Sequence, residues 1–464
     1  MRSIDHGAGT RPAAVASSVT DVLDWFEGRR QANTYNTRLI PLAQLSEWNL
    51  DLGTGDLVHR SGRFYTVTGL DVANASRSRA QWQQPIILQS EVGILGILLK
   101  DIDGEPHCLL QSKMEPGNVN LLELSPTVQA TKSNFTQAHG GRTVPYLKYF
   151  KDRTRGRVVF DALQSEQGSW FYAKRNRNIV VHTEVEVEEH EDFVWIPLTI
   201  IGDLLRVPNL VNMDTRTVLS GMLTVRPGDP DEVPAQDAFR SSMAPGPNRA
   251  YRPLHSMVGL LSALTAAKAN SEMRRKLKPL VEVERWQMRD GMISHDDGLH
   301  FSILGLEVEA SNREVDRWSQ PMVAPRGRGI AALVGRHLDD TLHVLVNLRM
   351  EAGAFDLLEL AATVHFCPDN YKGPSAVGPP PRFADVVRDA RPEQVRFDCV
   401  HSEEGGRFFQ AQTRYMLLID ESLPAEAPPG YLWITPRQLA SLVRFGNHVN
   451  VEARSLLACL GFLT

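Results

Sequence analysis

Apolar residues recur with helical spacing in two segments that lie far apart in the chain. The first set is Val19, Val22, Leu23 and Phe26, and the second, 238 residues later, is Met257, Leu260, Leu261 and Leu264. Positions i, i+3, i+4 and i+7 share one face of an α-helix, so each set predicts an amphipathic helix.

Strand patterns follow the first of these helices. Residues 86–114 predict two strands around an Asp-Gly turn, and LLEL at 121–124 predicts a short strand. Residues 170–189 predict one or two more strands. Residues 193–206 change from strand to helix, and residues 211–222 predict a helix with Asn or Asp near its start. Strands that are bracketed by helices at both ends indicate a mixed α+β unit.

The same order of elements occurs twice, because the chain carries a tandem duplication. KMEPGNVNLLELSPTV (113–128) and RMEAGAFDLLELAATV (349–364) are identical at nine of sixteen positions, with an offset of 236. Three further pairs match: W-x-Q-P at 82–85 and 318–321, SEQGSWF and SEEGGRF at 165–171 and 402–408, and RVPNLVNMDTR and RFGNHVNVEAR at 206–216 and 444–454. The repeated unit is therefore about 200 residues long.

The duplication predicts the domain organisation. We expect an N-terminal tail at 1–17, a first repeat at 18–225, a linker rich in Pro and polar residues at 226–252, and a second repeat at 253–464. A unit of this length can bury its own core. We also expect the two repeats to pack together as one pseudo-symmetric body.

Composition and charge narrow the class of protein. Of 464 residues, 42% are hydrophobic and 23% are charged, as in globular proteins, and the net charge of −5 disfavours nucleic acid as a partner. No apolar run approaches the roughly 20 residues that span a bilayer, and the first residues lack the apolar core of a secretory signal. The four cysteines lie far apart, which predicts neither a zinc site nor disulfides and suits a reducing cytoplasm.

The sequence contains no P-loop, H-E-x-x-H or G-x-S-x-G motif. A pattern similar to a dinucleotide-binding fingerprint begins at Gly327, but its counterpart in the first repeat begins with Glu91, and no helix is expected after either. We therefore predict no cofactor and no metal site. Catalysis would rest on ordinary acid–base and hydrogen-bonding side chains.

Polar side chains concentrate in residues 111–146 of the first repeat. The candidate site residues in this segment are Lys113, Glu115, Asn118, Gln129, Thr131, Ser133, His139 and Tyr146. The second repeat has lost several of them, since Ala354 replaces Asn118 and His365 replaces Gln129. Such losses are expected where a repeat keeps the fold but not the active site.

Two glutamates occur in both repeats. Glu115, which matches Glu351, follows a strand and opens a Pro-Gly turn, so its carboxylate either projects into a pocket or remains a capping or surface group. Glu123, which matches Glu359, lies on the opposite face of its strand from the neighbouring leucines. We expect a structural role for this second pair.

Basic residues form another candidate group. In the run from Lys174 to Arg177, alternate residues of a strand share a face, so Lys174 with Asn176, or Arg175 with Arg177, can clamp a diphosphate. The arginines that occur in both repeats include Arg177 with Arg414 and Arg216 with Arg454. These paired arginines belong either to the scaffold or to an anion-binding site.

Long motifs in a fixed order resemble the NDP-hexose 2,3-dehydratases of deoxysugar biosynthesis. They are SKMEPGN, LSPTVQATKSN, HGG, LQSEQG, KRNRN and VNMDTRTVLS in the first repeat, and FDCVHSEEGGRF, YLWITPRQLASL and VNVEARSLLACL in the second. The resemblance implies a Nudix-like mixed-sheet fold for each repeat, a dTDP-4-keto-6-deoxyhexose substrate and loss of water across C2–C3. It also implies a homodimer and functional coupling to a 3-ketoreductase that consumes the unstable product.

The resemblance suggests roles for the candidate residues. Glu115 would be the base or acid at C3 or C2, and Lys113 and His139 would serve the second proton transfer or stabilise the oxyanion at O4. The arginines assigned to the substrate, chiefly to its diphosphate, are Arg175, Arg177, Arg216, Arg414 and Arg454, and the aromatic residues assigned to thymine are Trp82, Phe135 and Tyr146.

Two rival hypotheses remain. The first is a non-catalytic nucleotide-sugar binding protein with two equivalent sites, which the unequal polar residues of the two repeats disfavour. The second is a Nudix-type diphosphohydrolase, but the sequence lacks the Nudix box, and a shared fold does not imply a shared activity.

Overall fold

The computed structural model describes residues 14–74, 81–132, 143–224, 251–313 and 315–462. Most of the predicted tail and linker lie outside these ranges, as do the candidate residues Ser133, Phe135 and His139. Within the described ranges, every helix is too short or too polar to cross a membrane.

The first repeat follows the predicted order of helix, strands and helix. Its helices are α1 (Val19–Ala32), α3 (Leu147–Lys151), α4 (Ile201–Leu204) and α5 (Met213–Ser220). Its strands, with the short β1 (Ala14–Val15) before them, are β2 (Tyr35–Ile40), β3 (Trp48–Leu50), β4 (Leu57–His59), β5 (Thr66–Asn74), β6 (Gln81–Leu88), β7 (Gly93–Ile102), β8 (Glu105–Met114), β9 (Leu122–Pro126), β10 (Val128–Ala130), β11 (Arg157–Ser165), β12 (Phe171–Tyr172), β13 (Arg175–His182) and β14 (Phe193–Pro197).

The second repeat has an equivalent set of elements. Its helices are α7 (Met257–Ala269), α8 (Ala384–Arg388), α9 (Pro436–Val443) and α10 (Val451–Gly461). Its strands are β15 (Met273–Lys278), β16 (Trp286–Arg289), β17 (Met292–His295), β18 (Phe301–Ala310), β19 (Arg317–Pro325), β20 (Gly329–Leu338), β21 (Thr341–Met350), β22 (Leu358–Ala361), β23 (Val364–Phe366), β24 (Val395–Ser402), β25 (Gln412–Ile419) and β26 (Tyr431–Ile434).

The sequence predictions for the main helices and strands are confirmed. α1 and α7 begin after Ser18 and Ser256, whose side chains accept hydrogen bonds from backbone N–H groups of the first turn. β7 and β8 pair antiparallel around the predicted turn, in which Gly104 has a φ of 82°. The chain is thus a mixed α/β protein built from two similar repeats.

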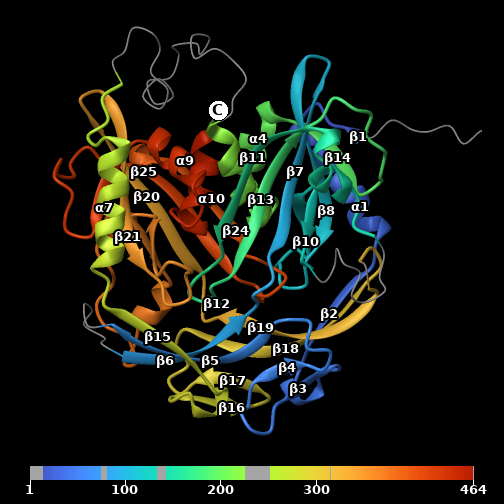
Figure 1. Cartoon of the computed structure of the whole chain (residues 1–464), viewed down its shortest axis with the longest axis vertical. Coiled ribbons are helices and arrows are strands. Elements are labelled where there is room, and N and C mark those ends of the chain that lie inside the picture. Colours follow the sequence, from blue (N-terminus) through green and yellow to red (C-terminus); the bar gives the residue numbers. More distant parts are fainter. Residues whose placement is uncertain (1–13, 75–80, 133–142, 225–250, 314, 463–464) are drawn as a thin grey trace, which may run out of the picture.

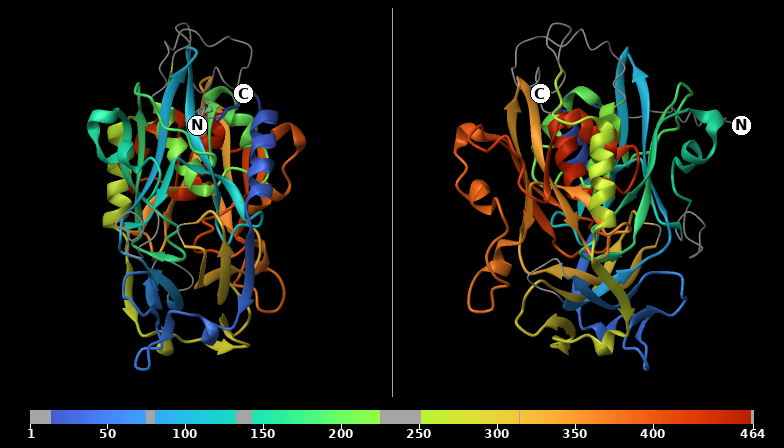
Figure 2. Two further views of the ribbon diagram at one scale, coloured as in Figure 1. Left: turned by 90° about the vertical axis from the view of Figure 1, so that its right-hand side faces the viewer. Right: turned by 60° about the vertical axis from the view of Figure 1, so that its left-hand side comes forward.

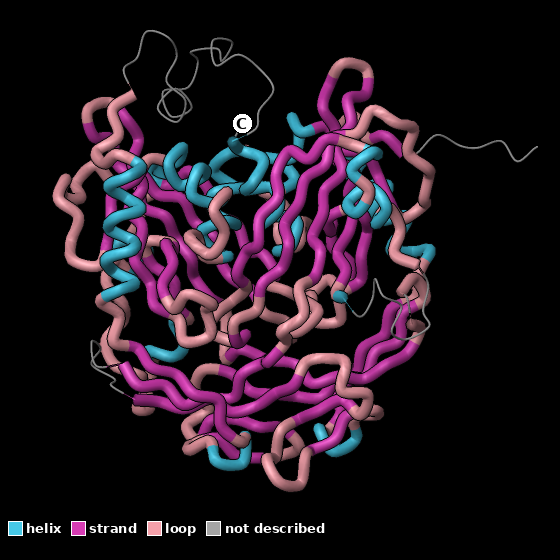
Figure 3. Tube along the Cα trace, viewed as in Figure 1, coloured by secondary structure: helices cyan, strands magenta, loops and turns pink. Residues whose placement is uncertain are grey.

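Four sheets form an upper and a lower half of the molecule (Figures 1 and 2). The upper sheets have the orders β1-β14-β8-β7-β13-β11 and β22-β21-β20-β25-β24, and the lower sheets have the orders β12-β6-β5-β4-β3 and β16-β17-β18-β19. Helices gather in the upper half, whereas the lower half is mainly strand and loop (Figure 3). α10 lies between the two upper sheets, where it packs against α5.

The two repeats exchange strands in the lower half. β2 of the first repeat pairs with β18 of the second, with Ile40 opposite Gly305, and β15 of the second repeat pairs with β5 of the first, with Lys278 opposite Gly69. A Cβ atom at Gly69 would lie 2.8 Å from the carbonyl oxygen of Lys278, and one at Gly305 would lie 2.6 Å from that of Ile40. The matching glycines therefore permit the exchange.

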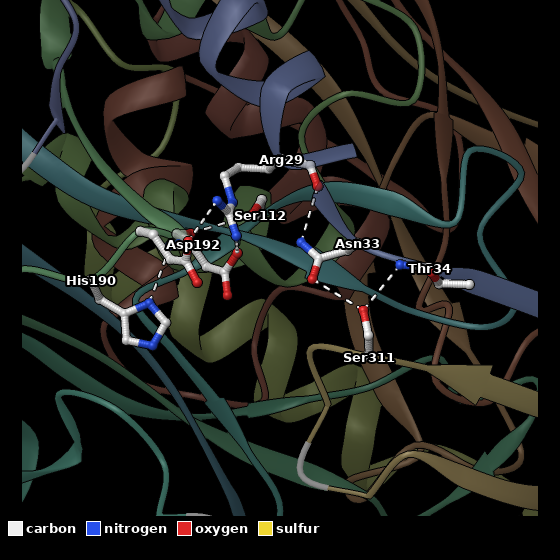
Figure 4. Close-up of polar contacts among 8 residues, drawn as sticks. Arg29, Asn33, Thr34, Ser112, His190, Asp192 and Ser311 are labelled. Carbon is white, nitrogen blue, oxygen red and sulfur yellow. Dashed lines mark hydrogen bonds and ion pairs between the residues drawn. The ribbon is translucent and has the colours of Figure 1, made fainter. Parts of the chain in front are cut away.

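Hydrogen bonds fix the point where the chain crosses from α1 into the other repeat (Figure 4). The amide of Asn33 donates to the carbonyl oxygen of Arg29 (3.0 Å) and accepts from the hydroxyl of Ser311 (3.2 Å), which itself accepts from the backbone N–H of Thr34 (3.0 Å). Arg29 pairs with Asp192 ahead of β14 (2.9 Å). The end of α1 is thereby tied to both repeats.

Two arginines lie fully buried between the repeats. Arg216 on α5 donates to the carbonyl oxygens of Val211 (2.6 Å) and Ser402 (2.9 Å), the latter in the second repeat. Arg454 on α10 donates to Ser165 in the first repeat (2.6 Å) by the equivalent contact. Both guanidinium groups thus hold the repeats together.

The glutamates of the two LLEL strands join the same contact. The hydroxyl of Ser402 donates to Glu123 (2.5 Å), and that of Ser165 donates to Glu359 (2.7 Å), so each glutamate reaches the other repeat. Burial raises the pKa of Glu123 to about 8 and that of Glu359 to about 7. These contacts agree with the structural role expected for both residues.

A close backbone approach between the repeats gives a test of this packing. A Cβ atom at Gly353 would lie 1.9 Å from the carbonyl oxygen of Phe171, so Gly353→Ala requires the main chain to move. We expect the free energy of unfolding to fall by about 1–3 kcal/mol in denaturant titrations. Gly28→Ala, in α1 with no atom within 4 Å of the new Cβ, is the control and should be neutral or stabilising. Equal stability of Gly353→Ala and the native protein would contradict the packing.

Candidate active site

A cavity of about 980 Å³ lies where the upper sheet of the first repeat meets the lower sheets. Its wall comes from both repeats. The first repeat contributes Lys113, Glu115, Gln129, Thr131, Glu166, Lys174 and Asp214, and the second contributes Arg313, Trp318, Gln320, Glu404 and Arg407. The volume and the many charged and polar side chains of the wall suit a polar ligand of nucleotide size.

Glu115 is held in this cavity by three neutral donors. It follows β8 directly and is only 3% exposed. Its carboxylate accepts hydrogen bonds from the amides of Gln129 (2.6 Å), Asn118 (3.3 Å) and Asn212 (3.3 Å), the last being the N-cap residue of α5. The three amides orient the carboxylate without placing a positive charge against it.

Three further carboxyl groups surround Glu115. Asp214, Glu166 and Glu404 each have a buried oxygen that finds no hydrogen-bond partner among the described residues. Burial raises the pKa of Glu404 to about 8, and it raises the pKa of Glu166. Burial, reinforced by the neighbouring carboxylates, raises the pKa of Asp214 well above its usual range. The raised pKa values favour the protonated forms of Asp214 and Glu404, which can then act as acids.

Lys174 stands among these acids. Its ammonium group donates to the carbonyl oxygen of Glu91 (2.5 Å), and burial lowers its pKa to about 8. Asn176, two residues further on in β13, donates to Glu166 (2.7 Å). A lysine with this pKa can either give or take a proton near neutrality.

The second repeat closes the cavity with an aromatic and cationic wall. The indole N–H of Trp318 donates to Gln320 (2.9 Å), whose amide donates to the carbonyl oxygen of Gly406 (2.6 Å). The guanidinium of Arg313 lies 5.6 Å from the Trp318 ring and donates to the carbonyl oxygen of Met114. Arg407 lies 4.4 Å from the ring of Tyr65.

A smaller cavity of about 440 Å³ occupies the equivalent position beside the upper sheet of the second repeat. There Arg349 replaces Lys113 and pairs with Glu351 (2.8 Å). Burial acts to raise the pKa of Glu351, but the adjacent guanidinium outweighs it, so the pKa is lowered. This carboxylate is therefore held in an ion pair.

The structure brings some predicted site residues together and separates others. Lys113, Glu115, Gln129 and Thr131 line the larger cavity, and Asn118 contacts it through Glu115. Trp82 lines the smaller cavity. The hydroxyl of buried Tyr146 donates to the carbonyl oxygen of Glu188 (2.7 Å).

The predicted arginines lie elsewhere. Arg177 pairs with Asp161 (2.6 Å) and Arg414 with Asp398 (2.5 Å), each on the neighbouring strand. The guanidinium of Arg175 lies 3.8 Å from the ring of Phe355. With Arg216 and Arg454 buried between the repeats, none of the five is among the described residues that line either cavity.

Sequence reasoning missed the acids Glu166, Asp214 and Glu404, and the second-repeat residues Trp318 and Arg407. A signal was present for two of them. Within the matched SEQGSWF and SEEGGRF segments, Glu404 corresponds to Gln167 and Arg407 to Trp170. The charged residues therefore lie in the copy that has lost other polar groups.

In the part of the chain that the structure describes, no group of three His, Cys, Asp or Glu side chains is placed to hold a metal ion. A carboxylate that accepts hydrogen bonds from amides, beside carboxyl groups with raised pKa values, is typical of an enzyme that transfers protons to and from substrate, such as a lyase or isomerase.

The chain belongs to the NDP-hexose 2,3-dehydratase family, whose model matches residues 19–222 and again residues 257–460. It is 48% identical to the dTDP-4-dehydro-6-deoxy-alpha-D-glucopyranose 2,3-dehydratase of Streptomyces violaceoruber over 440 residues, covering 94% of this chain and 95% of that protein. Proteins of the same name from Saccharopolyspora spinosa and Amycolatopsis orientalis are 46% and 44% identical, over 94% and 99% of this chain and 90% and 95% of their own.

The protonation of Asp214 can be tested through stability. A carboxyl group with a raised pKa in the folded state stabilises that state at low pH, and the contribution is lost as pH rises above the unfolded value. Asn copies the protonated acid but does not titrate, so Asp214→Asn should gain stability relative to the native protein between pH 5 and 8. The gain should not exceed about 1.4 kcal/mol per pH unit.

Denaturant titrations at several pH values measure this difference. Asp340→Asn, at an exposed turn position, is the matched control. A difference for Asp214→Asn that stays constant with pH would show that Asp214 is ionised in the folded protein.

Proposed function

We propose that this protein removes water across C2–C3 of a dTDP-4-keto-6-deoxyhexose and forms a 3,4-diketo-2,6-dideoxy sugar. The observation that carries the proposal is the cavity in which Glu115 faces Asp214, Glu404 and Lys174. The names of the three relatives, which give the substrate of each as a dTDP-4-dehydro-6-deoxy sugar, support the same substrate class.

The first half of the reaction is an elimination. The 4-keto group acidifies the C3 hydrogen, and Glu115 takes this proton as the C–H electron pair moves towards O4. Hydrogen-bond donors stabilise the charge on O4, for which Lys113 is a candidate. The electrons then form the C2–C3 double bond as the C2–O bond breaks, and Asp214 or Glu404 gives its proton to the departing hydroxyl, which leaves as water.

The second half is a tautomerisation. The intermediate is an enol, because its C3 hydroxyl is attached to the new C2–C3 double bond. Loss of the O3 proton and addition of a proton at C2 give the 3,4-diketone. One water is lost and no net oxidation occurs, so the balance requires proton donors and acceptors but no redox cofactor.

We assign the tail to residues 1–17, the repeats to 18–225 and 253–464, and the linker to 226–252. Each repeat is assigned a Nudix-like fold, on the strength of the sequence resemblance. The same resemblance supports a cytoplasmic homodimer whose product passes to a 3-ketoreductase, because a diketo sugar is reactive and needs rapid reduction.

One assay separates this function from its rivals. The protein is incubated with dTDP-4-keto-6-deoxyglucose in deuterium oxide without added metal, and the sugar is followed by mass spectrometry and NMR. We expect loss of water and incorporation of deuterium at C2. Binding without change to the sugar would favour a non-catalytic binding protein, and release of thymidine monophosphate would favour a diphosphohydrolase.

The role of Glu115 has a matched control in the other repeat. Glu115→Gln keeps the size and most hydrogen bonds but not the basicity, so turnover should fall by a factor on the order of 10³ or more while dTDP binding is retained. Glu351→Gln should keep most of the activity, measured below its own unfolding temperature. Native-like turnover by Glu115→Gln would remove Glu115 from the mechanism.

A further inference from the structure

We infer that the second repeat binds the nucleotide half of the substrate in the larger cavity, with Trp318 under the base and Arg407 at the diphosphate. This inference rests on the proposed function for the identity of the sugar. It assigns the first repeat to the sugar and the second to the nucleotide, so neither repeat holds a complete site.

The burial of the cavity wall sets the direction of the substrate. Glu115, Glu166, Asp214 and Lys174 are at most 5% exposed, so the acid–base groups occupy the deep end. Trp318 is partly exposed, and Arg317 beside it is exposed, so the second repeat forms the outer end. A sugar that reaches the acids must leave its nucleotide along this outer wall.

Trp318 offers a ring face rather than a hydrogen bond to a ligand. Its only N–H donates to Gln320, and the amide of Gln320 is bound to Gly406, so the indole is held in place. A fixed, partly exposed indole is a suitable surface for stacking a pyrimidine base. The indole N–H of Trp82 donates to Gln84 in the same way, but Trp82 lines the smaller cavity.

Arg407 supplies the charge that the smaller cavity lacks at the matching position. The equivalent residue there is Trp170, which is neutral. The guanidinium of Arg407 is positioned by Tyr65 (4.4 Å) and by bonds to the carbonyl oxygen of Gly406 (2.8 Å) and the side chain of Gln89 (3.3 Å). An arginine beside an acidic cluster would attract a diphosphate to this point and keep it away from the carboxylates.

Two probes separate the roles of these residues in the full-length protein. Binding of thymidine and of dTDP is measured by calorimetry or ligand-observed NMR for Trp318→Leu and Arg407→Gln. We expect Trp318→Leu to weaken both probes by about tenfold, because both carry the base. Arg407→Gln should weaken dTDP by about tenfold or more and leave thymidine unchanged, since only dTDP carries the diphosphate.

Trp82→Leu tests the alternative that the base stacks on Trp82 in the smaller cavity. If the base stacks on Trp318, the KM for the dTDP-sugar should rise about tenfold in Trp318→Leu, with a smaller change in kcat, and should rise less in Trp82→Leu. A larger KM effect at Trp82, or an equal effect of Arg407→Gln on both probes, would overturn the inference. Melting curves establish that each variant is folded, and Trp318→Phe, which keeps an aromatic face and should restore binding in part, replaces Trp318→Leu if that variant unfolds.

These experiments distinguish failure of the nucleotide site from failure of the proposed reaction. Native protein that binds dTDP through Trp318 but leaves the keto sugar intact would support the nucleotide wall and refute the dehydratase. Turnover with a native KM in Trp318→Leu would do the reverse.

Discussion

The guanidinium groups of Arg216 and Arg454 lie fully buried between the repeats, where their donors must find acceptors that water no longer supplies. Each guanidinium binds one backbone carbonyl group of each repeat, at Val211 and Ser402 or at Val449 and Ser165. Only the Nε–H of Arg216 lacks a hydrogen-bond partner among the described residues. These contacts hold α5 against α10 between the two upper sheets. The loops that follow Ser165 and Ser402 are thereby carried into the opposite repeat, so the position of the active-site wall depends on these contacts.

Because of this exchange, the two cavities do not belong to one repeat each. The larger one takes Glu115 and Asp214 from the first repeat but Glu404 and Arg407 from the second. A repeat that has lost its own polar residues can therefore still carry residues that the other site needs. The unequal SEQGSWF and SEEGGRF segments reflect that division: Glu404 and Arg407 of the second repeat line the larger cavity, and Gln167 and Trp170 of the first repeat line the smaller one.

The periodic features of the chain were predictable from the sequence, and so was the local cluster around Glu115. α1, α7, β7 and β8 follow from hydrophobic spacing, and Lys113 and Gln129 lie near Glu115 because β8 and β10 flank it. The sequence predicted two alternating faces for the basic run from Lys174 to Arg177 but not which face is buried. In the structure Lys174 and Asn176 line the cavity, while Arg177 pairs with Asp161. Contacts between repeats, such as those of Trp318 and Arg407, depend on the strand exchange, which no local pattern encodes.

One working site is thus assembled from both repeats. A crystal structure of the full-length protein with dTDP would reveal this assembly. We expect thymine to stack on Trp318, the diphosphate to contact Arg407, and its free end to point towards Glu115 in the larger cavity. A nucleotide bound along Arg175 and Arg177, or within residues of the first repeat alone, would contradict this assembly.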